Sequence, residues 1–252
     1  MAVEQVLRSR NVWTREERAI LEAAVSEYRS FDARATILRR GASIEVATLL
    51  LEGFVSRHVD GRDGLRQLVA MQAPGDFVDL HGYPLKSLDH DVGSLTPVKL
   101  AVIPHWKLWQ IQNENPDLAR KLWFLTVVDA AIHRKWMFRL GRLKAVQRLA
   151  HFLCETNARL FAIGLSDGRR FALPLTQFDL ADVCGLTSVH VNRVMRELRE
   201  RGLCTMRAGS VEILDFAGLM RLGAFEPGYL YLNDDVVKRL SAGEKMELSE
   251  DG

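Results

Sequence analysis

The segment of residues 176–203 carries the side chains of this sequence that could bind a phosphate backbone and read base edges. Two short amphipathic stretches flank Gly185, which permits a break in the backbone. Thr176 can cap the first stretch, with Asp179 three residues later, as in a capping box. Helical spacing predicts one buried face on each stretch, formed by Leu180, Ala181 and Cys184 in the first and by Val191, Val194, Met195 and Leu198 in the second.

The second stretch, capped by Thr187 or Ser188, leaves a polar and basic face opposite its apolar stripe. The residues of that face are Ser188, Val189, Asn192, Arg193, Arg196 and Arg199. A bracing helix followed by such a helix predicts a helix-turn-helix, whose second helix offers side chains to a major groove. An ordinary helical hairpin with a solvated basic face gives the same local pattern, so the neighbouring segments must decide between the two.

The distribution of charge points to nucleic acid more than the net charge does. The chain of 252 residues carries 34 basic and 32 acidic residues, a net charge of +2. Six basic residues and no carboxylate lie between residues 134 and 148: Arg134, Lys135, Arg139, Arg142, Lys144 and Arg148. A local field of one sign attracts a phosphate backbone. The hydrophobic content of 48% and the charged content of 26% are typical of a soluble globular protein, here long enough for two domains.

Neither a membrane span nor an oxidising compartment is indicated. No stretch approaches the roughly 20 apolar residues of a membrane helix, and the first residues lack the apolar core of a signal peptide. We therefore expect a cytoplasmic protein with no membrane partner. Cys154, Cys184 and Cys204 are far apart in apolar patterns, so we expect buried reduced thiols, with a redox-sensing thiol as the alternative.

The first half of the chain changes from a helical to a strand-like pattern. Residues 14–28 predict a short capped helix. From Phe31 to Pro104, short apolar runs alternate with turn signals such as Asp60-Gly61 and Pro74-Gly75. This spacing predicts an antiparallel sandwich or barrel.

A long helix is predicted from Pro116, with Asn115 as its cap. It has two apolar stripes. The first consists of Leu118, Leu122, Leu125, Ile132 and Trp136, and the second of Phe124, Val127, Val128 and Ala131. A helix that is apolar on two faces packs against its own sheet domain on one side and against a partner copy on the other, so we assign the first stripe to dimerisation. A buried helix of a monomer is the alternative.

The second half of the chain completes the predicted organisation. Residues 139–142 are expected to form a break between two domains, with Gly141 as the hinge, and a helix over 144–161 follows. After the helix-turn-helix, residues 204–214 predict a hairpin around Ala208-Gly209-Ser210, which would form a wing. The expected division is a β-barrel sensor domain over 1–115, a dimerisation helix and hinge over 116–141, a winged helix-turn-helix over 142–222 and an extension without assigned role over 223–252.

This order of elements resembles the CRP/FNR family of bacterial transcription regulators, from about Phe31 to Leu214. The resemblance is carried by the helix-turn-helix, then by the segments LEGFVSRHV, PGDFVDLHG and GRLKAVQRLAHFL. It implies an α+β fold with an N-terminal antiparallel β jelly roll like that of cyclic-nucleotide-binding domains, a dimerisation helix and a C-terminal winged helix-turn-helix. It also implies a homodimer on palindromic double-stranded DNA, with RNA polymerase as a further partner and a signal sensed in the barrel.

The resemblance also implies roles for particular residues. Base readout would come from the start of the second helix, at Ser188, Val189, Asn192 and Arg193. Arg193 can bind guanine O6 and N7 with two hydrogen bonds, whereas Val189 stands where many members have glutamate. Contacts to phosphate, which position without specifying, are expected from Thr176, Gln177, Arg196 and Arg199.

The expected sensor chemistry departs from the best-known members. Where cyclic-nucleotide-binding members carry an Arg-Ser pair, this chain offers Lys86 against Asp89 and Asp91, so a cyclic nucleotide is not expected. No cysteine precedes Cys154, so the N-terminal iron–sulfur cluster of other members has no ligands here. Haem remains an alternative because histidines are available by type. We expect no cofactor and leave the effector open.

A small barrel is also compatible with two other functional classes. A cupin-like, metal-dependent barrel enzyme needs clustered ligands such as His-x-His, and no two histidines of this chain lie two residues apart. Sequence motifs of serine hydrolases, zinc proteases and phosphate-binding loops are also absent. We therefore expect no catalytic residues, no metal site and no enzyme. The third class, a protein-interaction module that does not bind DNA, is disfavoured by the basic second helix and the wing.

Overall fold

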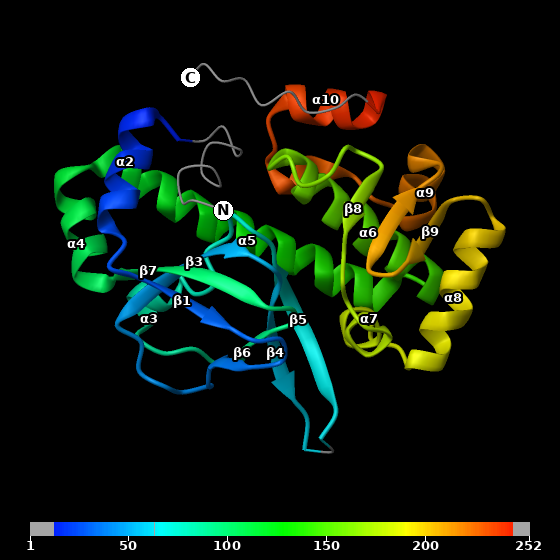
Figure 1. The fold of residues 1–252 in the computed structure, drawn as a ribbon, viewed down its shortest axis with the longest axis horizontal. Coiled ribbons are helices and arrows are strands. Elements are labelled where there is room, and N and C mark those ends of the chain that lie inside the picture. The colour runs from blue at the N-terminus through cyan, green and yellow to red at the C-terminus, as the bar shows by residue number, and fades with distance from the viewer. Residues whose placement is uncertain (1–12, 63, 244–252) are drawn as a thin grey trace. The chain divides into compact units, whose positions relative to one another are not determined.

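The computed structural model describes residues 13–62 and 64–243, and Figure 1 shows the order of their elements. The chain forms two compact units that divide within one long helix, between Ala130 and Ala131. We call residues 13–130 the first unit and residues 131–243 the second unit.

The first unit is built around two antiparallel sheets. One has the strand order β1–β7–β3, with β1 at Glu27–Phe31, β7 at Val98–Pro104 and β3 at Val46–Glu52. The other has the order β2–β6–β4–β5, with β2 at Thr36–Leu38, β6 at Asp91–Ser94, β4 at Val55–Asp60 and β5 at Arg66–Gln72. Leu50 and Leu100 of the first sheet pack with Val55 and Val92 of the second in one apolar cluster. The predicted antiparallel sandwich is thus confirmed.

The first helix is shorter than the sequence pattern predicts. Helix α2 spans Arg15–Ala24, and Thr14 caps it through a capping box with Glu17. The prediction over 14–28 was wrong at its end, because Ser26 already donates its backbone N–H to the carbonyl of Val102, at 2.9 Å. Pairing with β7 therefore takes the chain out of the helix and into β1.

Three more helices follow along the chain, and the first of them lies between strands β5 and β6. They are α3 at Gly82–Leu85, α4 at His105–Glu114 and α5 at Pro116–Arg142. Helix α5 begins at Pro116 as predicted, but residues 139–141, which were expected to belong to the break, are still helical. The helix continues to Arg142, and Leu143 still donates its N–H to the carbonyl of Arg139 at 3.2 Å. The chain turns only at Lys144, whose extended backbone starts the next helix.

The second unit packs helices around a small sheet with the order β8–β10–β9. Its elements are α6 at Ala145–Ala162, β8 at Arg170–Ala172, α7 at Gln177–Cys184, α8 at Ser188–Glu200, β9 at Cys204–Arg207, β10 at Ser210–Ile213, α9 at Phe216–Gly223, the 3-10 helix η1 at Pro227–Leu230 and α10 at Asp234–Ala242. Helix α6 is buried over nearly its whole length, from Leu149 to Ala162. It is the central element against which the others pack.

Helix α9 comes very close to α6 at Gly223. A Cβ at that position would lie 2.6 Å from the backbone nitrogen of His151 and 2.9 Å from its Cα. The imidazole Nδ1 of His151 also lies 3.0 Å from the carbonyl oxygen of Gly223. The absence of a side chain therefore allows the two helix backbones to touch, and the imidazole of His151 reaches the carbonyl of Gly223.

Candidate nucleic-acid interface

The first helix of the helix-turn-helix is closed at both ends as predicted. Asp179 Oδ2 accepts the backbone N–H of Thr176 at 2.7 Å, and Thr176 Oγ1 accepts that of Asp179 at 3.2 Å. At the other end Gly185 has the left-handed backbone angles φ 61° and ψ 48°. The next N–H, of Leu186, donates to the carbonyl of Ala181 at 2.9 Å. These bonds end α7 and direct the chain into α8.

Helix α8 buries one face and leaves the other in solvent. Thr187 rather than Ser188 caps it, because Thr187 Oγ1 accepts the backbone N–H of His190 at 3.3 Å. Val191, Val194 and Leu198 are buried, and Met195 is half-buried. The predicted apolar stripe therefore packs against the rest of the unit, so the opposite face is available to a ligand.

The predicted reading residues lie at the exposed start of α8. Val189 is 78% exposed, Asn192 and Arg193 are exposed, and Ser188 is half-buried. Asn192 Nδ2 donates to Gln177 Oε1 at 2.7 Å, which joins α8 to the first residue of α7. An Arg193 guanidinium nitrogen lies 2.7 Å from His190 Nε2. These contacts limit the rotamers of the polar side chains before any ligand arrives.

The wing adds a basic residue that sequence reasoning missed. Strands β9 and β10 form the predicted hairpin, with Ala208 and Gly209 at positive φ angles of 48° and 74°. A polar cavity of about 660 Å³ lies between α8 and this hairpin. Arg196 and Arg199 line it from the helix, and Arg207 lines it from the wing. Only the pairing of β9 with β10 brings Arg207 to the same groove as the other two arginines.

Two residues of the basic run between residues 134 and 148 have another role than the one expected from their charge. Arg139 is fully buried, donates to the carbonyl of Val183 at 3.0 Å and lies 4.0 Å from the centre of the Trp136 ring. Burial holds the pKa of Arg139 below its usual value. Arg148 donates to the carbonyl of Cys184 at 3.1 Å. These two cations therefore fix the end of α7, and the expectation that the run as a whole attracts phosphate was wrong for them.

A buried carboxylate joins three elements of the second unit. Glu155 Oε1 accepts the indole N–H of Trp136 at 2.9 Å, and its Oε2 accepts the hydroxyl of Tyr229 at 2.6 Å. Arg159 lies 3.7 Å from the same carboxylate. Burial, with the charge of Glu155, raises the pKa of Tyr229. Tyr229 belongs to the extension to which the sequence assigned no role, and its hydroxyl ties that extension to Glu155.

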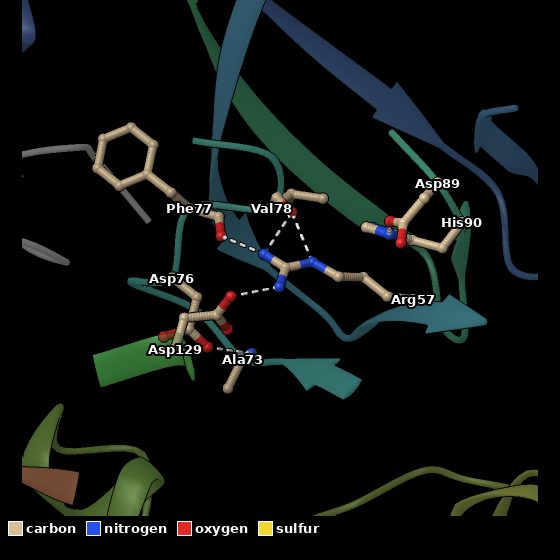
Figure 2. A network of polar contacts seen from close by, with 8 residues as sticks. All are labelled: Arg57, Ala73, Asp76, Phe77, Val78, Asp89, His90 and Asp129. Carbon is tan, nitrogen blue, oxygen red and sulfur yellow. Dashed lines mark hydrogen bonds and ion pairs between the residues drawn. The ribbon is translucent and has the colours of Figure 1, made fainter. Parts of the chain in front are cut away.

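A second buried network joins strand β4 of the first unit to α5, as Figure 2 shows. The Arg57 guanidinium donates to the carbonyl of Val78 at 2.9 and 2.7 Å, and it forms an ion pair with Asp129. Close by in the sequence, Asp79 Oδ1 accepts the backbone N–H of Thr48 at 2.6 Å. Burial raises the pKa of the Asp79 carboxyl to about 6.

The segment expected to exclude cyclic nucleotides is engaged in local contacts. Asp89 Oδ1 lies 2.8 Å from His90 Nδ1, and this contact holds the pKa of Asp89 below its usual value. Asp91 Oδ1 accepts the backbone N–H of Arg40 at 3.0 Å. The ammonium of Lys86 lies 4.8 Å from the centre of the Tyr83 ring. None of these three contacts brings a second basic side chain to join Lys86, as binding of a cyclic phosphate would require.

All three thiols are buried and free, as predicted. Burial raises the pKa of Cys184 to about 11 and that of Cys204 to about 12, and it raises the pKa of Cys154 well above its usual value. Because the thiolate is the reactive form, burial disfavours the alternative of a redox-sensing thiol. The described residues contain no helix long and apolar enough to cross a membrane.

The structure corrects the residues assigned to dimerisation on α5. Leu118 and Leu122 are 1% and 7% exposed because they pack into the core of the first unit, and Leu125 packs partly against the same core. Trp136 is buried at the Glu155 network, and Ile132 is half-buried. Three of the five assigned residues are thus covered by their own chain. The large apolar side chains that α5 exposes within the first unit are instead Trp123, Phe124 and Val127.

Known proteins share this arrangement. Residues 147–222 match the Crp-like helix-turn-helix domain. Over 177 residues the chain is 31% identical to the nitrogen fixation regulation protein FixK of Bradyrhizobium diazoefficiens, a match that covers 69% of this chain and 73% of that protein. The chain belongs to the CRP/FNR family of transcription regulators. This CRP/FNR regulator is also 28% identical over 209 residues to the transcriptional activator protein FnrL of Cereibacter sphaeroides, covering 81% and 83% of the two chains.

The fold of the regulator is that of solved members of the family. The structure of FixK2 from Bradyrhizobium japonicum superposes with a TM-score of 0.71 at 25% identity, covering 79% of this chain and 98% of that one. The regulator therefore has an N-terminal β domain and a C-terminal helix-turn-helix that binds DNA. Because its relatives are transcriptional regulators and not enzymes, the alternative of a cupin-like enzyme is set aside.

Proposed function

We propose that this CRP/FNR regulator binds palindromic duplex DNA as a homodimer, with one α8 helix in each of two major grooves about 34 Å apart. The observation that carries the proposal is the exposed start of α8, where polar and basic side chains stand opposite a buried apolar stripe. Contact with RNA polymerase is proposed from FnrL, which is named a transcriptional activator. The division into a sensor domain, a dimerisation helix over 116–141, a DNA-binding domain and an extension is part of the same proposal.

Base readout is assigned to the first turns of α8, at Ser188, Val189, Asn192 and Arg193. Arg193 has the length and donors to bind guanine with two hydrogen bonds, and Asn192 has the donor and acceptor that pair with adenine. Val189 cannot accept a proton from cytosine and suits a thymine methyl group instead. The preferred site of this regulator therefore differs from one read by glutamate at that position.

Phosphate contacts are assigned to residues around the same groove. Thr176 and Gln177 are exposed at the start of α7, and Arg196 and Arg199 are exposed along α8. Arg207 of the wing joins them because it lines the cavity that these two arginines also line. Such contacts add affinity that depends on salt but not on sequence.

A pair of arginine variants tests these roles, after in vitro selection has defined the preferred duplex. Arg193→Ala is expected to lose about 1–3 kcal/mol of specific binding and to change non-specific binding little. Arg196→Ala is the matched control, and it should weaken binding to every duplex alike while lowering the salt slope by about 1. An equal loss for Arg193→Ala on selected and scrambled duplexes, measured by fluorescence anisotropy, would show that Arg193 contacts phosphate only.

The dimer contact is assigned to the exposed apolar side chains of α5. Trp123 is 69% and Val127 45% exposed, and a spacing of four residues places them on one face of the helix. The double variant Trp123→Glu, Val127→Glu is expected to sediment as a monomer and to bind a half-site weakly. Trp109→Glu on α4 changes a tryptophan of similar exposure, 62%, and should leave the dimer intact. A monomeric wild type at micromolar concentration would exclude the two-fold arrangement.

Control by a small molecule is proposed from a cavity in the first unit. It measures about 660 Å³ and lies among α3, α4 and α5, with Leu108 and Leu122 in its lining. The Tyr83 hydroxyl donates to Gln112 Oε1 at 3.2 Å and supplies the polar groups beside the apolar lining. This size and composition suit a small organic ligand. Native mass spectrometry of the purified protein should find a bound molecule that the cavity-filling variant Ala119→Phe no longer retains.

A further inference from the structure

The second sheet of the first unit brings together three metal-ligating side chains that no sequence motif announces. One ring nitrogen of His58 and one carboxylate oxygen each of Asp60 and Asp91 lie within 4.8 Å of one another. His58 is buried, Asp91 is half-buried and Asp60 is exposed. The cluster therefore extends from inside the sheet to solvent, which gives an ion a way in.

Strand geometry explains why these three side chains meet. His58 and Asp60 are two residues apart on β4, and side chains at this spacing point to the same face of a strand. Asp91 is the direct partner of His58 in the antiparallel pairing of β4 with β6. Directly opposite residues have their Cβ atoms roughly 5 Å apart, so the carboxylate of Asp91 is held beside the imidazole.

The imidazole is oriented by a fixed set of neighbours. Ser56 Oγ lies 3.3 Å from His58 Nδ1 and donates its proton to the carbonyl of Gly93 at 3.2 Å. In the tautomer that carries its proton on Nδ1, His58 donates to this hydroxyl, and the lone pair of the neutral ring is on Nε2. Gly93 leaves room for the ring, since a Cβ there would lie 3.2 Å from His58 Cε1. A hydrogen bond from the second nitrogen is the usual support of a metal-binding histidine.

We propose that His58, Asp60 and Asp91 bind a first-row divalent transition metal ion, such as Zn²⁺, Mn²⁺ or Co²⁺. One imidazole and two carboxylates suit these ions, and three protein ligands leave positions for water. His-x-His spacing, which the sequence lacks, is not needed, because β6 supplies the third ligand across the sheet. The site shares no residue with the proposed DNA contacts of α7 and α8.

Two neighbours set how tightly the ion binds. Arg66 Nε donates to Asp60 Oδ1 at 3.0 Å, and the backbone N–H of Arg40 donates to Asp91 Oδ1 at 3.0 Å. Each contact uses one oxygen and leaves Oδ2 of that carboxylate for the metal. The guanidinium of Arg66 repels a cation, however, so it weakens the affinity of the site for the ion.

Metal titration of the untagged full-length protein, stripped with a chelator, tests the site. Isothermal calorimetry with Zn²⁺ and Mn²⁺ should give one ion per chain, and Co²⁺ should develop the visible absorption of a protein-bound ion. Asp91→Asn and His58→Gln are expected to weaken binding by at least about tenfold. Arg66→Gln is expected to tighten it a few-fold, because it removes the nearest positive charge.

A neighbouring carboxylate provides the matched control. Asp89→Asn removes the same charge two residues from Asp91 but lies outside the cluster, so its affinity for metal should equal that of the wild type. Far-UV circular dichroism and thermal unfolding identify any variant that has lost its fold, and Arg66→Gln then decides the question, because a misfolded protein would not gain affinity. No saturable binding below millimolar metal, or equal losses in Asp89→Asn and Asp91→Asn, would overturn the proposal.

Discussion

The two units hold their parts of α5 through buried charges of opposite sign. In the first unit the charge is the Arg57 cation, which is bonded to main-chain carbonyls and paired with Asp129 of α5. In the second unit it is the Glu155 anion, which accepts from Trp136 of α5 and from Tyr229. The side chain of Asp129 is 30% exposed, whereas that of Glu155 is 1% exposed.

This difference in exposure separates a contact that can open from one that cannot. Water can solvate Asp129 when the ion pair with Arg57 breaks, so the free energy of separating α5 from β4 is modest. No water reaches Glu155, and its donors would be left buried and unsatisfied without it. The contact of Trp136 with Glu155 is therefore fixed, whereas the contact of Asp129 with Arg57 is one that a signal could change.

The largest effect is expected from Glu155→Ala. It leaves Arg159 as a buried cation and removes the acceptor of two buried donors, which costs about 3–5 kcal/mol of unfolding free energy. Glu197→Ala on α8 removes a carboxylate that is paired with Arg201 at the surface, and it should cost at most about 1 kcal/mol. Chemical denaturation measures both. A loss below about 1 kcal/mol for Glu155→Ala would mean that solvent reaches the network.

Asp79 beside the Arg57 network makes the first unit sensitive to pH. Its folded pKa of about 6 exceeds the unfolded value of about 3.9, so the folded state binds the proton more tightly. This contribution to stability is present below about pH 4 and is lost as the pH rises through about 6. Asp79→Asn keeps the acceptor for Thr48 and removes the titration. Its unfolding free energy relative to that of the wild type should therefore rise by about 2–3 kcal/mol between pH 4 and pH 7. If the difference between the two proteins does not change with pH, the pKa of Asp79 is not raised in the folded state.

Asp129→Asn tests the contact that can open. The variant keeps an oxygen for Arg57 but loses the opposite charge, and we expect a loss of about 1–2 kcal/mol because the side chain is partly solvated. Hydrogen exchange of the α5 amides should increase in this variant more than in Asp117→Asn, which changes an exposed carboxylate of the same helix. A loss as large as that of Glu155→Ala would remove the distinction between the two networks.

The smallest effect concerns the extension. Tyr229→Phe removes one hydroxyl that donates to Glu155 and should cost about 1 kcal/mol. Tyr231→Phe, two residues later at an exposed position, is the control and should stay within about 0.5 kcal/mol of the wild type. If both variants match the wild type in thermal unfolding, the extension does not stabilise the second unit through this network.

Features set by residues close together in the sequence could be predicted, and features set by residues far apart in the sequence could not. The helix-turn-helix was predictable because its determinants are local: a capping threonine, a glycine in the turn and an apolar stripe at helical spacing. The stripe of Leu118 and Leu122 was correctly read as apolar, but spacing identifies a shared face without saying what covers it. Their own sheet domain covers them.

Features that depend on distant pairing were missed for the same reason. The charge of Arg139 suggested a phosphate site, and only its position over the Trp136 ring and at the end of α7 gives it a structural role. Arg207 reaches the groove of α8 through the β9–β10 hairpin, and Asp91 reaches His58 through the register of β4 and β6. The register of strands is not visible in a single sequence, so these groupings could not be predicted.

The contact at Gly223 constrains how this sequence can vary during evolution. Any substitution, even to alanine, would place a carbon atom inside the van der Waals radius of the α6 backbone, which cannot move aside as a side chain can. Substitution of Gly223 is therefore not tolerated unless α9 is lost or moves away from α6. Surface positions of the same helix, such as Arg221, carry no such restriction and should diverge freely among descendants of this regulator.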